Sequence, residues 1–412
     1  MVCVGVALGS LASQWVPVKA AVKGDYELVQ VQVIARHGAR TPILSARTPQ
    51  TLLNLPWTCE PYEKENPYLV IEKNNFVVPY DEYKVVTLHS YGKKPTFGGS
   101  CVDGQLTLKG MEQATQLGAL LRQRYIVNTP FLPEKYGGDS VYFRSSSTSR
   151  TILTARNIVN GLYPLNFRAK EDKVVVHIKA DENLYGRSAC RNFLELKKLQ
   201  RSGPKHQSLS QQIKQISEKV TEDTAYWGTR SICGYANDLS ALVDHGFPLP
   251  KGLDKKDYDQ VRQISGSNYA LTYSSDNLKR VSIGRFLGDV MGNINKAIQT
   301  PIGRIPKLVL ISGHDNTLGP LLNTLQVFDG KHPRMGSAFI IELWKNSKGE
   351  HFFQFFKYDP TDGLKPLRMP DCKTEVCPIN ILQNHVGPLI PTPQEYDEEC
   401  FVPKKNTEHQ FP

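Results

Sequence analysis

Two short apolar runs, far apart in the chain, each end abruptly in a polar cluster that contains histidine. Leu28–Ala35 leads into the sequence RHGARTP at positions 36–42, and Lys307–Ile311 leads into the sequence SGHD at positions 312–315. Runs this rich in Val, Ile and Leu are typical of strands buried in a parallel sheet. Because ligands bind at the carboxyl ends of such strands, we expect both clusters to face one cleft.

Strand-like runs alternate with helical patterns along the chain, which favours the α/β class. The strand-like runs are Leu28–Ala35, Ser140–Phe143, Lys173–Lys179, Leu308–Ile311, Ala338–Trp344 and His351–Tyr358. Thr107–Tyr125 and Asp276–Ile298 carry apolar residues at helical spacing. We expect both helices to pack on the sheet.

The β-type pattern fades between residues 181 and 266, where the sequence is polar and helix-prone. We interpret this part as a smaller, mainly helical insertion, so that residues 24–180 and 267–412 form the α/β core. Residues 1–23 are apolar or small in large part and fit a secretory leader. No later segment offers the roughly 18 apolar residues of a membrane span, so we expect none in the mature chain.

A long irregular stretch, Ser45–Ser100, follows the first histidine cluster and is rich in proline and aromatic residues. Two interpretations stay open for its aromatic side chains, which are Trp57, Tyr62, Tyr68 and Tyr80. They can form one wall of a binding cleft, or they can pack this segment onto the body of the protein.

The charge balance is basic, with 50 Lys and Arg against 40 Asp and Glu, a formal net charge of +10. This excess favours acidic partners such as phosphorylated metabolites, anionic lipid surfaces or nucleic acid. The basic residues are scattered and form no motif combined with aromatic residues. We therefore do not expect nucleic-acid binding.

Eight cysteines fit an oxidising compartment, which points to a secreted or lysosomal protein of the secretory pathway. Spacing alone does not fix their connectivity. Candidate pairs are Cys372 with Cys377, Cys59 with Cys101, and Cys190 with Cys400. A zinc site is not expected, because no two cysteines have ligand spacing with a histidine pair nearby.

The residues of the two clusters supply the groups that hydrolysis of a phosphomonoester needs. A neutral His37 nitrogen can attack phosphorus and form a phosphohistidine. Arg36, Arg40 and Arg150 offer planar cations that match phosphate oxygens. Asp315 can protonate the leaving oxygen and then activate water. Because that role needs a protonated carboxyl group, activity should be greatest in acid unless burial raises its pKa. This chemistry requires neither a metal nor another cofactor.

Each of these residues also has a structural interpretation. Asp315 can be the N-cap of the helix that follows, because Asp is common there. His314 can be a hydrogen-bonded core histidine, and Arg150 a surface charge on a strand-to-helix turn. We interpret Arg144, which precedes the same turn, as structural.

The sequence at 36–42 resembles the Arg-His-Gly-x-Arg-x-Pro signature of the histidine acid phosphatases, and His314-Asp315 resembles their second His-Asp motif. Arg150, six residues after Arg144, matches their additional phosphate-binding arginine. The resemblance implies a three-layer α/β/α core with a mostly parallel central sheet and a smaller helical cap.

The same resemblance implies the role of each site residue. His37 becomes the phosphorylated nucleophile and Asp315 the proton donor. Arg36, Arg40, Arg150 and His314 become the phosphate-binding residues.

Within the family, the chain is most similar to the animal prostatic, lysosomal and lysophosphatidic acid phosphatases. One departure is the segment Gly336-Ser337-Ala338, where prostatic-type relatives place a cysteine, so Cys233 lacks its expected partner. The leading hypothesis is a metal-independent acid phosphatase acting on phosphomonoesters, with lysophosphatidic acid or similar small phosphoesters as one candidate substrate class.

Other interpretations of the function stay open. They are a phytase-like inositol phosphate phosphatase, a phosphosugar phosphatase of the secretory pathway, and a catalytically silent phosphate- or lipid-binding protein. Loss of His37 or Asp315 would mark the silent protein, and both residues are present. The oligomeric state also stays open, with a homodimer as one option.

Overall fold

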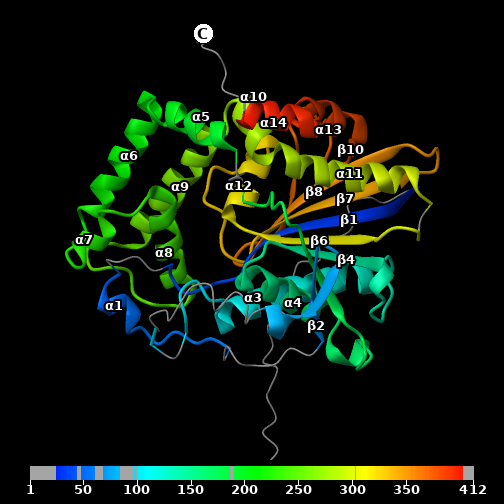
Figure 1. Cartoon of the computed structure of the whole chain (residues 1–412), viewed down its shortest axis with the longest axis horizontal. Helices are drawn as coiled ribbons and strands as arrows, with labels where there is room; N and C mark the ends of the chain where they lie inside the picture. Colours follow the sequence, from blue (N-terminus) through cyan, green and yellow to red (C-terminus); the bar gives the residue numbers. More distant parts are fainter. Residues whose placement is uncertain are drawn as a thin grey trace, which may run out of the picture.

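The computed structural model describes residues 25–43, 48–60, 68–83, 97–98, 101–185, 190–301 and 303–401. The predicted leader at 1–23 and Tyr62 lie outside the described residues. Strands and helices alternate along the chain, and the strands form one ten-stranded sheet. The prediction of an α/β fold is confirmed (Figure 1).

Five parallel strands form the centre of this sheet. In spatial order they are β1 (Tyr26–Arg36), β6 (Leu308–Gly313), β4 (Val141–Ser145), β5 (Val174–Ile178) and β2 (Leu69–Lys73). Antiparallel strands complete both sides, namely β3 (Phe76–Pro79), β7 (Ala338–Asn346), β8 (His351–Asp359), β9 (Gly363–Leu367) and β10 (Cys377–Pro378). The carboxyl ends of the parallel strands therefore meet at one edge.

All six strand-like runs of the sequence are strands here, with ends that differ by a few residues. The sequence did not reveal β2, β3, β9 and β10. Strand β2 lies inside the stretch 45–100 that we predicted to be irregular, and this part of the prediction is wrong. This strand has only five residues, and only Leu69 and Ile71 among them are buried. The alternation of buried and exposed side chains is therefore too short to stand out in the sequence. Its pairing with β5 makes it a strand.

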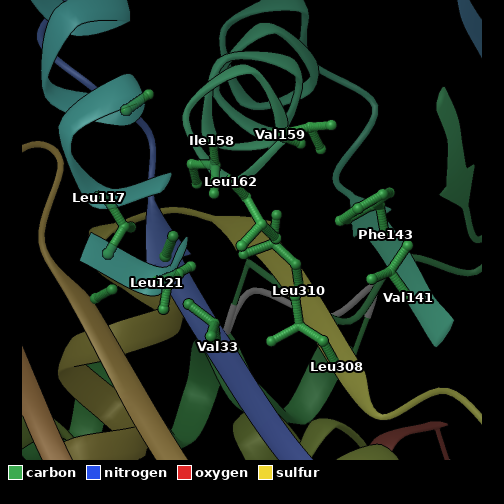
Figure 2. Close-up of a cluster of buried hydrophobic side chains, with 14 of the residues drawn as sticks. Val33, Leu117, Leu121, Val141, Phe143, Ile158, Val159, Leu162, Leu308 and Leu310 are labelled. Carbon is green, nitrogen blue, oxygen red and sulfur yellow. The ribbon is translucent and has the colours of Figure 1, made fainter. Parts of the chain in front are cut away.

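Alternate side chains of the central strands enter two different cores. Val31 and Val33 of β1 and Leu310 of β6 belong to one core, while Ile34 and Ile311 belong to the other. Helices α3 (Leu108–Arg122) and α4 (Ser149–Leu162) cover the first face, where their apolar side chains meet the strands (Figure 2). Helices α11 (Arg285–Gln299), α12 (Asp315–Thr324) and α13 (Ile379–Val386) cover the second (Figure 1). The protein is thus a three-layer α/β/α sandwich.

Both predicted helices are confirmed, and each contains a π-helical segment. Thr107 caps α3 by accepting a hydrogen bond from the Gly110 N–H over 3.2 Å. The helix then continues as the π-helix η1 (Gln123–Asn128). In the second helix, α10 (Asp276–Lys279) passes through the π-helix η4 (Arg280–Gly284) into α11.

The part predicted as a helical insertion consists of helices that lie beside the sheet (Figure 1). They are α5 (Arg191–Arg201), α6 (Pro204–Ser217), α7 (Thr224–Trp227), α8 (Ile232–Asp244) and α9 (Lys255–Thr272). Their apolar side chains, such as Ile216, Trp227 and Leu239, form a core apart from those of the sheet. We call these helices the cap. Helix α9 continues past residue 266, and the division of the chain at 181 and 266 stays a prediction.

The remaining elements are short, apart from the C-terminal helix. They are α1 (Gln50–Leu53), η2 (Gly138–Ser140), η3 (Leu165–Phe167), η5 (Gly387–Leu389) and α14 (Pro393–Phe401). All three candidate disulfides are formed, which are Cys59–Cys101, Cys190–Cys400 and Cys372–Cys377. Cys233 is a free thiol. Within the described ranges, no helix is both long and apolar enough to cross a membrane.

Candidate active site

The two histidine clusters meet at the carboxyl edge of the parallel strands. Arg36 at the end of β1 is paired with Gly313 at the end of β6. Beyond this pair, the His37 N–H donates to the Gly313 carbonyl over 3.0 Å. The rings of His37 and His314 then lie edge to face with their centroids 5.5 Å apart. The prediction that the two clusters share one cleft is confirmed.

Arg150 reaches the same edge from β4. Ser145 of β4 is paired with Ser312 of β6, and the next N–H, of Ser146, donates to the Ser312 carbonyl over 3.2 Å. The chain then turns into α4, whose second residue is Arg150. Three segments distant in sequence therefore converge on one point.

Backbone contact with α3 fixes the loop that follows His37. A Cβ atom on Gly38 would lie 2.2 Å from the Gly110 carbonyl oxygen, and one on Gly110 would lie 2.1 Å from the Ala39 carbonyl oxygen. Only glycine permits so close an approach. The Gly38 N–H donates to Thr154 Oγ1 over 3.1 Å, and the Ala39 N–H donates to Gln113 Oε1 over 2.8 Å. The loop is thus held by both helices of this face.

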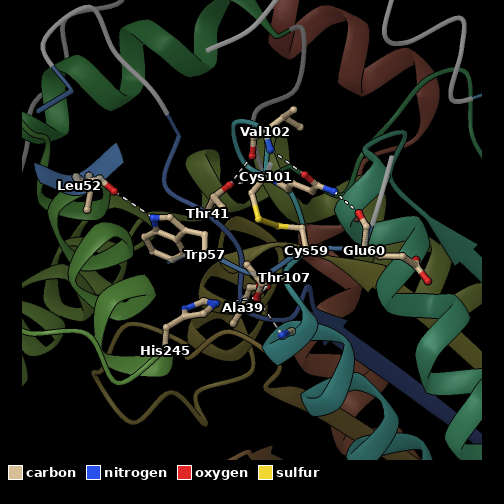
Figure 3. The surroundings of a disulfide bond; sticks show 12 residues. Ala39, Thr41, Leu52, Trp57, Cys59, Glu60, Cys101, Val102, Thr107 and His245 are labelled. Atoms are coloured by element: carbon tan, nitrogen blue, oxygen red, sulfur yellow. Dashed lines mark hydrogen bonds between the residues drawn. A yellow bond between two sulfur atoms is a disulfide. The ribbon is translucent and has the colours of Figure 1, made fainter. Parts of the chain in front are cut away.

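A disulfide braces the far side of the same loop (Figure 3). Cys59–Cys101 lies beside Thr41, whose hydroxyl donates to the Val102 carbonyl over 2.7 Å. Thr107 Oγ1 donates to the Ala39 carbonyl over 3.0 Å. These contacts fix the backbone between His37 and the end of the motif.

The described aromatic residues of the stretch 45–100 pack onto the body of the protein. Trp57 is fully buried, and its ring centroid lies 4.8 Å from that of His245 and 4.8 Å from that of Phe247. Tyr80 is also buried, and Tyr68 packs against the core beneath α3 and α4. Among the described residues, those that line the cavity at His37 include none of these three. Packing is therefore the better interpretation for them.

The His37 ring is held in one tautomer. Nδ1 lies 2.9 Å from the Gly38 carbonyl oxygen, which can only accept, so Nδ1 carries the proton and Nε2 keeps its lone pair. Burial, followed by the nearby charges of Arg36 and Arg150, holds the pKa of His37 well below its ordinary value. The ring is therefore neutral and nucleophilic at one defined nitrogen.

Three guanidinium groups surround this ring, those of Arg36, Arg40 and Arg150. Burial, together with the like charge of Arg150, lowers the pKa of Arg40 to about 9. Burial also lowers the pKa of Arg150. Both Nη atoms of Arg36 are hydrogen-bonded within the protein, to the Pro333 carbonyl and to Asn237 Oδ1, whereas Arg40 and Arg150 line the cavity. Planar guanidinium groups of this kind fit an anion with several oxygens.

Asp315 is the first residue of α12 and lies beside this cationic cluster. Its Oδ2 atom accepts from Asn237 Nδ2 over 3.0 Å and lies 4.0 Å from Arg36 Nη2. Burial favours the neutral acid, but Arg36 and the hydrogen bond from His332 outweigh burial. The pKa of Asp315 is therefore well below its ordinary value, and burial does not leave this carboxyl protonated.

His314 lies between Ser146 and Tyr185. Its Nε2 atom is 2.8 Å from Ser146 Oγ, and the Tyr185 ring stacks on it at 4.5 Å. Burial and the charge of Arg150 lower the pKa of His314 well below its ordinary value. His314 lines the cavity at His37, and its role in binding phosphate stays a prediction.

Arg144 points away from this cluster. It pairs with Asp289 at 2.7 Å and Glu182 at 3.1 Å, and it donates to Asn183 Oδ1 over 2.5 Å. Its charge is therefore compensated within the fold, and the structural interpretation of Arg144 is confirmed.

A cavity of about 400 Å³ opens on His37, Arg40, Arg150, His314 and Asp315. Its other walls include cap residues and aromatic side chains that sequence reasoning did not identify, namely Tyr185, Lys197, Arg201, Asn237, Tyr269 and Tyr273. Most of these residues lie in helices with ordinary amphipathic sequences, and no local motif marks them. Only the three-dimensional fold brings them to the site.

The described residues contain no group of three or more His, Cys, Asp or Glu side chains arranged to hold a metal ion. The positive charge of the site comes from arginine. That the reaction needs no metal stays a prediction.

Comparisons with known proteins agree with this fold. The family model of the histidine phosphatase superfamily, branch 2, matches residues 27–358. The chain belongs to this family, and the prediction of a histidine acid phosphatase that hydrolyses phosphomonoesters is confirmed.

Two relatives and one solved structure illustrate the similarity. A probable acid phosphatase of Dictyostelium discoideum is 29% identical over 95% of this chain and 83% of its own length. The bovine (Bos taurus) lysophosphatidic acid phosphatase type 6 is 28% identical over 91% of this chain and 86% of its own length. The phytase of Hafnia alvei in complex with myo-inositol hexakis sulphate superposes with a TM-score of 0.63 at 13% identity, covering 93% of this chain and all of that one. At that identity the phytase supports the fold alone.

Proposed function

We propose that this protein hydrolyses phosphomonoesters in two steps, through a phosphohistidine at His37. One observation carries the proposal. The Nδ1 proton of His37 is bonded to the Gly38 carbonyl, so the lone pair of Nε2 is available beside the guanidiniums of Arg36, Arg40 and Arg150. A nucleophile and a cationic cradle for phosphate thus lie together.

In the first step His37 Nε2 attacks phosphorus. The P–N bond forms, the bond from phosphorus to the ester oxygen breaks, and the electron pair leaves with that oxygen. A proton from Asp315 neutralises the departing alkoxide. The three arginines bind the phosphoryl oxygens and stabilise their charge in the transition state.

In the second step water replaces the histidine. The Asp315 carboxylate takes a proton from water, whose oxygen forms the new bond to phosphorus. The P–N bond breaks and its electron pair returns to His37 Nε2. Inorganic phosphate leaves, and Asp315 is again protonated for the next cycle.

The low pKa of Asp315 fits the second step directly, because a base must be ionised. For the first step it must gain a proton, and the negative charge of a bound phosphate monoester favours that gain. An acidic medium supplies the proton. We therefore keep the expectation that activity is greatest in acid.

The cavity beyond the phosphate site favours a small alcohol with an apolar part. Ile43, Tyr185, Tyr269 and Tyr273 line it, and the relative named lysophosphatidic acid phosphatase matches most of this chain. We propose lysophosphatidic acid or a similar small phosphoester as substrate. Lys197 and Arg201 line the same cavity, and their positive charge can bind further phosphate groups. An inositol phosphate is therefore the second candidate substrate.

A rate survey at acid pH tests these proposals. We expect the enzyme to hydrolyse p-nitrophenyl phosphate and lysophosphatidic acid with or without chelator, and to lose activity in His37→Ala. Faster turnover of phytate than of lysophosphatidic acid would select the second candidate. Hydrolysis that chelator abolishes and His37→Ala retains would exclude the phosphohistidine route.

We further propose that the protein is made in the secretory pathway and is secreted or lysosomal. Its three disulfides support this location, since such bonds persist in oxidising compartments. N-terminal sequencing of the mature protein tests whether residues 1–23 are removed. Sedimentation of the purified protein would decide between a monomer and a homodimer.

A further inference from the structure

His332 is a buried histidine that the two-step mechanism does not use. It lies in the segment between α12 and β7, and its side chain is fully buried. Two hydrogen bonds tie its backbone to Arg262 of α9. The His332 N–H donates to the Arg262 carbonyl over 2.9 Å, and Arg262 Nη2 donates to the His332 carbonyl over 3.0 Å. The position of the ring is therefore fixed by the cap.

The His332 ring contacts the proposed proton donor. Its Nε2 atom is 3.3 Å from Asp315 Oδ2 and 3.2 Å from Asn237 Oδ1. Both of these oxygens are hydrogen-bond acceptors. Asp315 Oδ2 belongs to a carboxylate, and Asn237 Oδ1 is an amide oxygen that also accepts a hydrogen bond from Arg36 over 2.5 Å. Nε2 must therefore carry a proton. Its Nδ1 atom is 2.9 Å from Ser265 Oγ, whose hydroxyl can donate to it. A neutral ring satisfies every one of these contacts.

These bonds hold the Asp315 carboxylate in one orientation. The Asn316 N–H donates to Oδ1 over 2.9 Å. Oδ2 accepts hydrogen bonds from Asn237 Nδ2 and from His332 Nε2. Each oxygen therefore has a fixed donor, and rotation of the carboxylate would break hydrogen bonds in a buried site, which is costly.

We propose that His332 is a positioning residue of the phosphatase reaction, which orients Asp315 and favours its ionised form through the hydrogen bond from Nε2. This inference rests on the proposed function. It assigns His332 chiefly to the second step, in which the ionised carboxylate takes a proton from water. The transferred proton resides on Asp315, and His332 keeps its own.

Polar groups face His332 from four elements, and those on three of them are charged or titratable. Asp315 lies on α12 and Arg36 on β1, while Arg262 and Tyr269 lie on α9, with the Tyr269 ring 5.7 Å away. Asn237 of α8 is the neutral member of this set. Removing the His332 donor leaves Arg36, Asn237 and the Asn316 N–H to stabilise the Asp315 carboxylate. The pKa of Asp315 should then rise, because one hydrogen bond to its charged form is lost.

Two substitutions separate a hydrogen-bond role from simple packing. His332→Leu fills the space without a donor, whereas His332→Gln keeps an N–H at similar reach. The matched control is His206→Leu, because His206 is also a buried cap-side histidine, only 4% exposed, that lies in a different cavity. His332→Asn, whose amide is too short to reach Asp315, replaces the leucine variant if that variant does not fold.

The readout is the fraction of enzyme that carries label during turnover of ³²P-labelled p-nitrophenyl phosphate. This substrate has a weakly basic leaving group, so its first step needs little help from an acid. We expect His332→Leu to slow turnover roughly 10- to 100-fold, as loss of a supporting hydrogen bond does at metal sites. The labelled fraction should rise, and the acid limb of kcat, which reports ionisation of Asp315 in the phosphorylated enzyme, should move to higher pH. In His332→Gln, the turnover rate, the labelled fraction and the acid limb should return most of the way to the wild-type values. In His206→Leu, all three should match the wild type.

The proposal fails if His332→Leu or His332→Asn shows the labelled fraction and pH profile of the wild type. It also fails if His332→Gln is as impaired as His332→Leu, because then only the imidazole ring itself matters. Failure of the proposed function gives a different result, since the wild-type enzyme would then carry no label at any stage.

Discussion

The backbone N–H of His37 donates to the carbonyl of Gly313 over 3.0 Å, directly beyond the last paired residues of β1 and β6. This one bond joins two motifs that lie far apart in the sequence. It places the His37 ring, which we propose as the nucleophile, next to the segment that carries His314 and Asp315. The site is therefore a property of the sheet edge, and its geometry depends on how the nearby backbone is packed.

Gly110 should be essential for that packing. In an ordinary helix, replacing glycine with alanine stabilises by about 1 kcal/mol. At Gly110 the sign should reverse, because a Cβ would lie 2.1 Å from the Ala39 carbonyl oxygen. We expect Gly110→Ala to lower the free energy of unfolding by roughly 1–3 kcal/mol, the usual cost of overpacking.

Urea denaturation measures this effect. Gly138→Ala is the control, because nothing lies within 4 Å of a Cβ there. A Gly110→Ala protein as stable and active as the control would mean that the loop after His37 does not depend on this contact.

Arg150 should contribute to catalysis through its shape as well as its charge. We expect Arg150→Ala to reduce kcat/KM by about 10²–10³, as loss of one transition-state donor does. Arg150→Lys should recover only part of this loss, because lysine keeps the charge but lacks the planar pair of donors. Steady-state kinetics of the two variants decide the point. Full recovery by lysine would show that charge alone is needed.

The acid limb of kcat/KM should lie well below pH 6.5. Attack needs the unprotonated His37, and burial with the charges of Arg36 and Arg150 lowers its pKa. The lone pair therefore persists as the pH falls through the ordinary range of histidine. Removing one positive charge by Arg150→Gln should raise the pKa of His37 and move this limb to higher pH.

A matched control removes the same charge elsewhere. Arg304 is exposed and precedes β6, so it lies at the opposite edge of the sheet. Arg304→Gln should leave the acid limb in place. An equal shift in both variants would point to net charge as the cause rather than to contact with His37.

The Cys59–Cys101 disulfide should stabilise the protein more than Cys372–Cys377. The first closes a sequence separation of 42 residues and the second a separation of 5. Loop entropy predicts losses of about 4 and about 2 kcal/mol when each pair is replaced by serine. Thermal unfolding of the two double variants tests this order. Equal losses would contradict the entropic account.

The sequence could predict that the two histidine clusters share one cleft, because each cluster follows the end of a strand. His37, Arg40 and Asp315 belong to local motifs, and a parallel sheet brings such motifs to one edge. The three disulfides could be proposed but not proven, since spacing allows other pairings.

Other features had no local signal. Asn237 lies in the middle of the amphipathic helix α8, and His332 lies in a segment without periodicity. Both reach Asp315 only because the cap lies over the sheet edge. Strand β2 likewise exists because β5 offers it a partner. Tertiary contacts determine where these residues and this strand lie, and no short stretch of the sequence carries that information.

Isolation of the phosphorylated enzyme tests the central claim most directly. Enzyme mixed with ³²P-labelled substrate and quenched within milliseconds in alkaline denaturant should carry label on His37, and the bond should be lost in acid, as expected for phosphorus bonded to nitrogen. The His37→Ala variant should carry none. Product that accumulates while no label joins the wild-type chain would contradict the phosphohistidine mechanism.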